Sequence, residues 1–109
     1  MVEACIAASR PGTPARELVT AVESIAEEMG EAQWFIPYMA GHGMGCSQLE
    51  IPHIYPHSED VLAPNQWYAL ECMVSDPERG TGQMEGIVLI TPEGSEYLSQ
   101  VPLRPWRDL

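Results

Sequence analysis

Basic residues are scarce in this chain. It has 5 Lys and Arg against 16 Asp and Glu, which gives a formal net charge of −11 at pH 7. A field of that sign repels a polyanion, so nucleic acid is excluded as an expected partner. The acidic excess suits a protein that binds divalent cations, although an acidic and soluble surface is the simpler explanation.

Cysteines are also few. Cys5, Cys46 and Cys72 are odd in number and no two are close in sequence, so they form no disulfide framework and favour a reducing compartment. No apolar run reaches the roughly 18 residues that span a bilayer, and the first residues lack the basic and apolar segments of a signal peptide. We therefore expect a soluble, cytoplasmic protein without a membrane partner.

The length and the start of the chain bear on its domain organisation. At 109 residues it is one domain at most, and its apolar share of 45% argues against disorder. Residues 2–9 have the pattern of the end of a helix, with no cap or turn before them. A domain that starts within a helix suggests that part of it lies upstream.

The clearest local element is an amphipathic helix over residues 14–29. The breakers at residues 10–14 separate it from the preceding helix, and Thr13 is expected to cap it, with Pro14 in the first helical position. Gly30 is expected to end it. Its apolar residues recur at the spacing of one helical face: Leu18, Val19, Val22, Ile25, Ala26 and Met29.

The second half of the chain is typical of strands. Residues 34–39 indicate a short strand or extended segment, and residues 51–66, with three prolines, indicate a loop. Residues 67–74 and 83–90 predict a hairpin, because turn formers fill the segment between them. A second, tight hairpin is predicted over residues 92–94.

Two glutamates, Glu71 and Glu85, lie inside these otherwise apolar strands. Burying an ionised carboxylate without a partner costs several kcal/mol. The two positions are symmetric about Glu78 in the predicted turn, so the hairpin would place them opposite each other with Cβ atoms about 5 Å apart. Like charges at that separation repel unless a cation lies between them. The pattern indicates a metal site; the alternative is that one or both carboxylates point to solvent.

One histidine is surrounded by glycines, in the segment Gly41-His42-Gly43-Met44-Gly45. Glycines let the backbone adopt conformations closed to other residues and let another group approach closely. His42 is therefore a candidate ligand, and a loop histidine without such a role is the alternative. Cys72 follows Glu71 in a strand, so its side chain should point to the opposite face and belong to the core.

In this order the segments resemble the creatinase/aminopeptidase family of pita-bread metallohydrolases, which includes methionine aminopeptidases, Xaa-Pro dipeptidases and creatinase. Residues 10–17 resemble its "RPG-T-xx-E" start of a helix, and residues 41–52 resemble its "GHGIG … E-x-P" segment. Residues 69–71 are similar to the strand of its first glutamate ligand, and residues 83–94 resemble "RIEDTVLVTEDG" around the second. The similarity runs from about residue 3 to residue 99.

The resemblance implies an α+β fold, the C-terminal half of a pita-bread fold, with a curved antiparallel sheet and helices on one face. It implies that His42, Glu71 and Glu85 are ligands of two divalent metal ions that activate a water to attack a peptide bond. Manganese is expected, with cobalt and zinc as alternatives. No further catalytic side chain is assigned, and a small peptide is the expected substrate.

The resemblance also implies what is missing. Two aspartate ligands of the family lie on strands before the helix where this chain begins. Residues 1–109 would then be a partial pita-bread catalytic domain, and the missing N-terminal half, with the two aspartates, would be its partner. We expect the chain alone to be inactive and, as is common in the family, the complete protein to form homodimers.

Some positions depart from the family pattern. Leu49 and Tyr38 stand where many peptidase members have histidines. Two alternatives therefore remain, a creatinase-like hydrolase or lyase of a small non-peptide substrate and a non-catalytic pita-bread binding module. His53 is interpreted as a loop histidine, and Asp60 and Asp76 do not match the ligand pattern.

Overall fold

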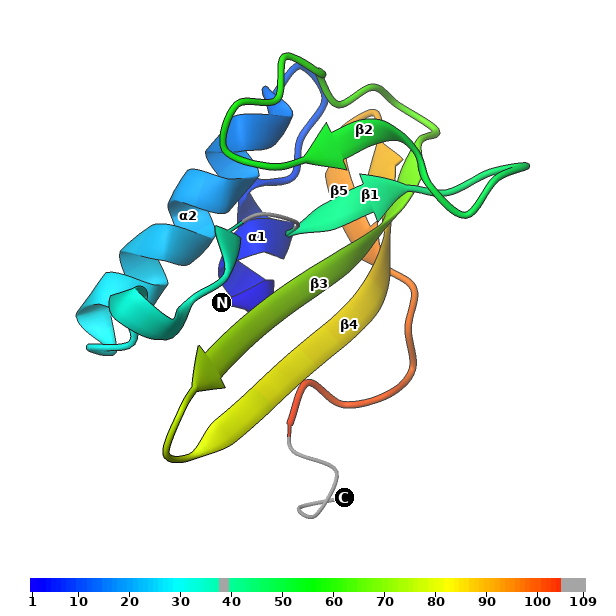
Figure 1. Ribbon diagram of the computed structural model, residues 1–109. Helices are drawn as coiled ribbons and strands as arrows, with labels where there is room; N and C mark the ends of the chain where they lie inside the picture. The colour runs from blue at the N-terminus through cyan, green and yellow to red at the C-terminus, as the bar shows by residue number, and fades with distance from the viewer. Residues whose placement is uncertain (38–39, 105–109) are drawn as a thin grey trace.

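Two helices cover one face of an antiparallel sheet (Figure 1). The computed structural model describes residues 1–37 and 40–104. The sheet order is β2-β1-β3-β4-β5, with every neighbouring pair antiparallel. This confirms the predicted α+β class with helices on one face. The elements are α1 Val2–Ala8, α2 Ala15–Glu28, the 3-10 helix η1 Ala32–Trp34, β1 Gly41–Gly43, β2 Glu50–Ile54, β3 Trp67–Asp76, β4 Gly80–Thr91 and β5 Gly94–Tyr97.

Both predicted helices form, and α2 ends at the predicted glycine. Gly30 has φ 71°, a conformation that favours glycine. Its N–H donates to Glu27 O at 3.0 Å and the Glu31 N–H donates to Ala26 O at 2.8 Å, which satisfies the last carbonyls of the helix in a Schellman motif. None of the helices in residues 1–37 and 40–104 is long and apolar enough to cross a bilayer.

The predicted cap of α2 is wrong by one residue. Pro14 occupies the cap position, and no side chain caps the helix. The backbone is instead satisfied by the segment that precedes β3, where the Ala15 N–H donates to Asp60 O at 2.8 Å and the Leu62 N–H donates to Thr13 O at 2.9 Å. Because a distant segment supplies these bonds, the Thr13 hydroxyl is not needed as a cap.

The strand predicted at residues 34–39 does not form as such. Glu31 O accepts hydrogen bonds from the Trp34 and Phe35 N–H groups at 2.9 and 3.1 Å, so the backbone keeps turning after α2. Phe35 is extended and forms an isolated bridge with Val74, and the Ile36 N–H donates to Met73 O at 3.0 Å. Residues 38–39 lie outside the described residues.

The loop predicted at residues 51–66 begins instead as a strand. β2 includes Pro52, a residue type that is typical of loops. β2 lies at the edge of the sheet, and its pairing with β1 is irregular. Edge strands and bulges are the places where a sheet tolerates a residue without an N–H donor. Residues 55–66, between β2 and β3, form no helix or strand.

The two predicted hairpins are confirmed. β3 pairs with β4 from Trp67↔Leu89 to Asp76↔Gly80, a register centred on Glu78 as predicted. The connection is shorter than the predicted turn segment, because both strands extend to residues 76 and 80. β4 turns into β5 through Pro92 and Glu93, with Thr91 paired to Gly94.

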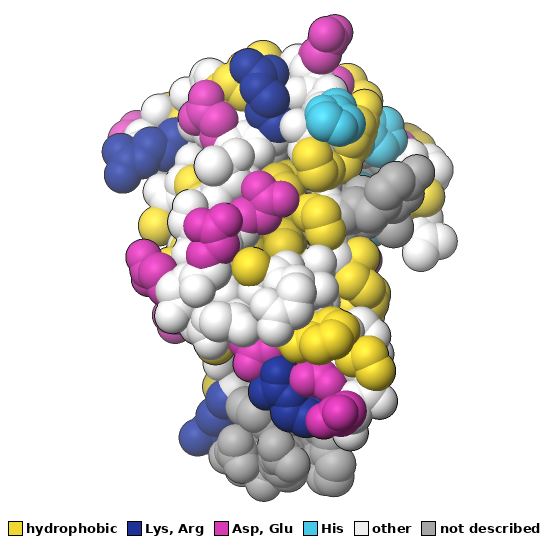
Figure 2. Space-filling view, turned by 60° about the vertical axis from the view of Figure 1, so that its left-hand side comes forward, with side chains coloured by type: hydrophobic (Ala, Val, Ile, Leu, Met, Phe, Trp, Pro, Cys, Tyr) yellow, Lys and Arg dark blue, Asp and Glu magenta, His cyan; other side chains and the backbone are white. Residues whose placement is uncertain are grey.

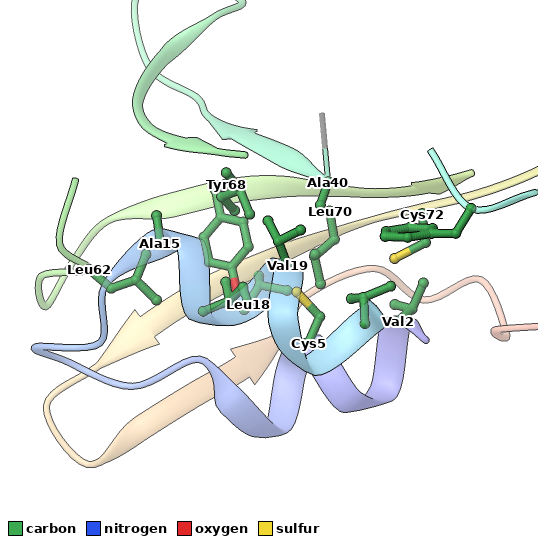
Figure 3. Close-up of a cluster of buried hydrophobic side chains, with 14 of the residues drawn as sticks. Val2, Cys5, Ala15, Leu18, Val19, Ala40, Leu62, Tyr68, Leu70 and Cys72 are labelled. Atoms are coloured by element: carbon green, nitrogen blue, oxygen red, sulfur yellow. The ribbon is translucent and has the colours of Figure 1, made fainter. Parts of the chain in front are cut away.

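The core lies between the helices and one face of the sheet (Figure 3). Tyr68, Leu70 and Cys72 alternate along β3 and point toward the helices, where Cys5 and Leu18 are among their neighbours in the core. The core also includes Val88 and Ile90 of β4 and Ile54 of β2. Alternation then directs the intervening residues of each strand to the other face of the sheet.

The glycines of β1 allow its neighbours to approach closely, as predicted. A Cβ atom on Gly41 would lie 2.3 Å from Ala69 O, and one on Gly43 would lie 2.1 Å from Ile51 O. Both contacts are with backbone, which cannot move aside as a flexible side chain can.

The first prediction concerns Gly41. Gly41→Ala should lower the free energy of unfolding by about 1–3 kcal/mol, because the added methyl overlaps β3. Gly82→Ala is the matched control, since nothing lies within 4 Å of a Cβ built there, and should change stability by no more than about 0.5 kcal/mol. Urea unfolding of both variants checks this; equal losses would contradict the packing described for β1.

The second prediction concerns the three free thiols. Burial raises the pKa of Cys72 to about 11 and raises the pKa of Cys5 further, whereas Cys46 is exposed. Since the thiolate is the reactive form, an aromatic disulfide reagent at pH 8 should modify one thiol in the folded protein and three after unfolding. Cys46→Ser should abolish the reaction of the folded protein; rapid modification of this variant would show that the core is open.

Candidate metal centre

The face of the sheet away from the helices carries the three predicted ligands. Tyr68 and Leu70 point toward the helices (Figure 3), so Ala69 and Glu71 point to the opposite face. Directly paired residues of antiparallel strands share a face. His42 pairs with Ala69, and Glu85 pairs with Glu71. All three side chains therefore start from one face.

The two glutamates lie opposite each other, as their symmetry about Glu78 predicted. The Glu71 side chain is 19% exposed, whereas Glu85 is exposed to solvent. Of the two carboxylates, Glu85 is thus exposed to solvent and Glu71 is largely shielded. Their role as ligands stays a prediction.

His42 is buried and contacts Glu71. Its Nε2 lies 3.3 Å from Glu71 Oε1, and its Nδ1 lies 3.1 Å from the carbonyl oxygen of Gly43. A carbonyl oxygen can only accept a hydrogen bond, so Nδ1 must carry a proton to satisfy this contact. Nε2 then faces a carboxylate oxygen, and the two repel unless a second proton or a metal ion lies between them.

The separation of these two atoms fits a shared metal ion. Two ligand atoms that are each about 2.1 Å from one ion lie about 3.0–3.4 Å apart at the angles of octahedral or tetrahedral coordination, and the observed distance is 3.3 Å. The third candidate ligand, Glu85, is not grouped with this pair. Among residues 1–37 and 40–104, no three His, Cys, Asp or Glu side chains lie closely enough together to hold an ion. Glu85 would have to turn toward Glu71 to complete the set.

Cys72 is a core residue, as predicted. It belongs to the helix-facing set of β3 and is 5% exposed, and burial raises the pKa of its thiol to about 11. A protonated thiol on the opposite face of the sheet cannot serve as a ligand of this site.

Asp76 has a structural role at the end of β3. Its carboxylate accepts hydrogen bonds from the Glu78 and Arg79 N–H groups at 2.7 and 3.0 Å and from Arg79 Nε at 2.5 Å. The Arg79 guanidinium holds the pKa of Asp76 below its usual range and also pairs with Glu31 at 2.6 Å. These contacts fix the β3–β4 turn and tie it to the end of α2.

Among the positions that depart from the family pattern, Leu49 is 53% exposed in the connection between β1 and β2. Glu50 closes this connection, because its Oε1 accepts a hydrogen bond from the Ser47 N–H at 2.6 Å. Tyr38 lies outside the described residues.

His53 is the residue that the sequence interpretation missed. It lies on β2, directly opposite His42, and not in a loop as expected. Along β2, Pro52 and Ile54 are buried, whereas Ile51 and His53 are exposed. The sequence does not show this alternation, because Ile51 is apolar on the exposed side and proline is typical of loops.

Comparison with known proteins identifies the family. Residues 1–92 match the model of "Metallopeptidase family M24". The chain is 33% identical over 95 residues to the Xaa-Pro dipeptidase of Pyrococcus furiosus, covering 87% of this chain and 27% of that protein. It is 30% identical over 99 residues to the "Probable dipeptidase PepE" of Mycobacterium tuberculosis, covering 91% of this chain and 26% of that protein. The chain thus spans about a quarter of the length of these relatives.

Solved structures agree with this fold. The dipeptidase PepE from Mycobacterium ulcerans superposes with a TM-score of 0.84 at 28% identity, covering 92% of this chain and 27% of that chain. The prolidase from Pyrococcus furiosus has the same TM-score at 31% identity, covering 92% and 29%. The sheet and helices are therefore part of a pita-bread fold, and the chain belongs to the metallopeptidase family M24.

Proposed function

We propose that this chain supplies three ligands, His42, Glu71 and Glu85, to a two-ion centre that hydrolyses the peptide bond of dipeptides, including Xaa-Pro dipeptides. The substrate class is that named for the similar Pyrococcus furiosus enzyme. The observation that carries the proposal is the 3.3 Å contact between His42 Nε2 and Glu71 Oε1, on the face where Glu85 is paired with Glu71.

Each of the three side chains has a distinct part. The Gly43 carbonyl orients His42, so that Nε2 faces Glu71 and is the nitrogen available for a ligand bond. Glu71 and Glu85 supply carboxylate oxygens from adjacent strands. When bound, divalent ions lower the pKa of a water molecule and stabilise the negative charge that develops on the peptide carbonyl.

The donor set favours a hard or borderline cation. One imidazole and two carboxylates suit manganese, with cobalt and zinc as alternatives. The neighbouring thiol of Cys72 lies on the helix-facing side of the sheet and adds no soft donor.

The remaining ligands belong to the rest of the domain under this proposal. The chain spans 26–27% of the length of the relatives cited above, and we propose that the polypeptide before residue 1 supplies two aspartates and the other half of the sheet. The chain alone would then be inactive, and the complete protein would be a cytoplasmic homodimer.

A second candidate function rests on the exposure of Glu85 and Leu49. A site in which Glu85 is exposed to solvent, with the apolar side chain of Leu49 in the β1–β2 connection, would also suit a small non-peptide substrate. Loss of ion binding altogether would leave a non-catalytic binding module.

The third prediction tests the ligands directly. His42→Ala and Glu71→Gln should each weaken the binding of Mn²⁺ to this chain by about ten-fold or more, measured by the decrease of the free Mn²⁺ signal in electron paramagnetic resonance. His57→Ala is the control, since His57 is exposed between β2 and β3, and should leave the affinity unchanged. Equal affinity in all four proteins would mean that Mn²⁺ binds elsewhere.

The fourth prediction separates the two candidate functions. The complete protein loaded with Mn²⁺ should cleave an Xaa-Pro dipeptide, and Glu71→Gln should lower kcat by about 100-fold or more, because a ligand of the ions that would activate the water is lost. A metal-loaded protein that cleaves no dipeptide would exclude the peptidase and favour a small non-peptide substrate.

A further inference from the structure

We propose that Trp67, with Met44 and Leu89 beside it, forms an apolar wall that determines which Xaa side chains the candidate site accepts. This inference rests on the proposed peptidase function, because it concerns the specificity of the same site. It assigns to the chain a specificity-determining residue in addition to the three candidate metal ligands.

The wall lies on the face of the sheet that carries the candidate ligands. Trp67 and Ala69 are two residues apart in β3, so their side chains leave the same face. Leu89 is the direct partner of Trp67 across β3 and β4. Met44 follows His42 by two residues at the end of β1, and its N–H donates to Trp67 O at 3.2 Å. The three apolar residues therefore form one row across this face.

Successive rows on this face carry different chemistry. One row holds the pair Glu71 and Glu85. The next row holds the pair His42 and Ala69, and the row after it is the apolar wall. Two residues along a strand span about 6.8 Å, so the wall begins one such step beyond His42. A substrate whose scissile carbonyl lies near His42 and Glu71 would thus have the side chain of a neighbouring residue within reach of Trp67.

The burial of Ala69 indicates that these side chains lie close together. Ala69 is 1% exposed, although its side chain is small and points away from the helices. The larger side chains around it on this face, which include His42 and Trp67, therefore close over it. Trp67 itself is 49% exposed, so its ring is both near the candidate centre and accessible to a substrate.

The wall suits an apolar side chain. An indole ring that is half exposed to water gains free energy when an apolar group covers it. Glu71 and Glu85 lie on the same face, and the chain has a formal net charge of −11. Figure 2 shows, on one face of the molecule, acidic side chains spread along its length and basic ones near its upper and lower ends. An apolar Xaa is therefore favoured, and an acidic Xaa is repelled.

Xaa is the part of the substrate that the wall can select. Proline is common to all Xaa-Pro dipeptides, so differences between their rates of cleavage arise from the side chain of Xaa. The gain in binding grows with the apolar area that this side chain covers. We therefore expect the rate of cleavage to fall from Phe-Pro to Ala-Pro and further to Asp-Pro.

The test compares kcat/KM of the metal-loaded complete protein for Phe-Pro and Gly-Pro, which differ in the side chain of Xaa. The wild type should prefer Phe-Pro about ten-fold or more, as expected when an aromatic side chain is partly buried against the protein. Trp67→Ala should reduce this ratio to about two-fold or less. Trp67→Phe should keep most of the preference, because it retains an aromatic ring.

Val61→Ala is the matched control. Val61 is also an exposed apolar residue, at 51%, but it lies between β2 and β3 in an isolated bridge with Pro14. This variant should keep the wild-type ratio. If Trp67→Ala lowers kcat/KM for both dipeptides by the same factor, Trp67 has only a structural role and the wall does not select Xaa. A wild type that does not prefer Phe-Pro would also overturn the proposal.

The binding of L-phenylalanine and glycine, measured by titration calorimetry on the same samples, keeps the two proposals apart. These amino acids are the Xaa products of the two dipeptides. A protein that cleaves both dipeptides without a preference would retain the peptidase function and lose the wall. A protein that cleaves neither, but binds L-phenylalanine about ten-fold more tightly than glycine through Trp67, would retain the wall and lose the peptidase function. If it neither cleaves a dipeptide nor prefers L-phenylalanine, both proposals fail.

Discussion

The pairing register of β3 and β4 is the constraint on which the candidate centre depends. A shift by one residue would turn Glu71 toward the helices and bury a carboxylate among Tyr68 and Leu70. Asp76 and Arg79 fix the turn at the end of this hairpin, and Glu31 ties Arg79 to the end of α2. These contacts support the β3–β4 register that places both glutamates on one face, and the pairing of β1 with β3 places His42 on the same face.

Much of the fold could be predicted because its signals are local. The 3.6-residue period of α2, the glycine that ends it and the symmetric turn about Glu78 each specify an element within a few residues. β2, the start of α2 and the segment at Phe35 could not, because distant partners determine them. Pro52 is tolerated in an edge strand whose pairing with β1 is irregular, and Thr13 is not a cap because residues 60–62 satisfy the backbone there. His53 lies in the same strand as Pro52, so its place in the sheet could not be predicted either.

Two of the three candidate ligands are in contact. His42 and Glu71 are in contact at a separation that suits one shared ion, and Glu85 is paired with Glu71 but remains exposed. The chain spans about a quarter of the length of its relatives, and under our proposal the rest of the domain supplies the two remaining ligands. Membership of the M24 family places the chain among metallopeptidases; the ligands, the metal and the substrate are proposals that rest on the geometry of this face.

The most direct measurement is anomalous diffraction from crystals soaked in Mn²⁺. The account predicts an anomalous peak on the face of the sheet away from the helices, about 2.0–2.3 Å from His42 Nε2 and from a carboxylate oxygen of Glu71, with Glu85 turned toward it. A peak on another part of the surface, with His42 still in contact with Glu71 alone, would contradict the central claim that these three side chains converge on one cation.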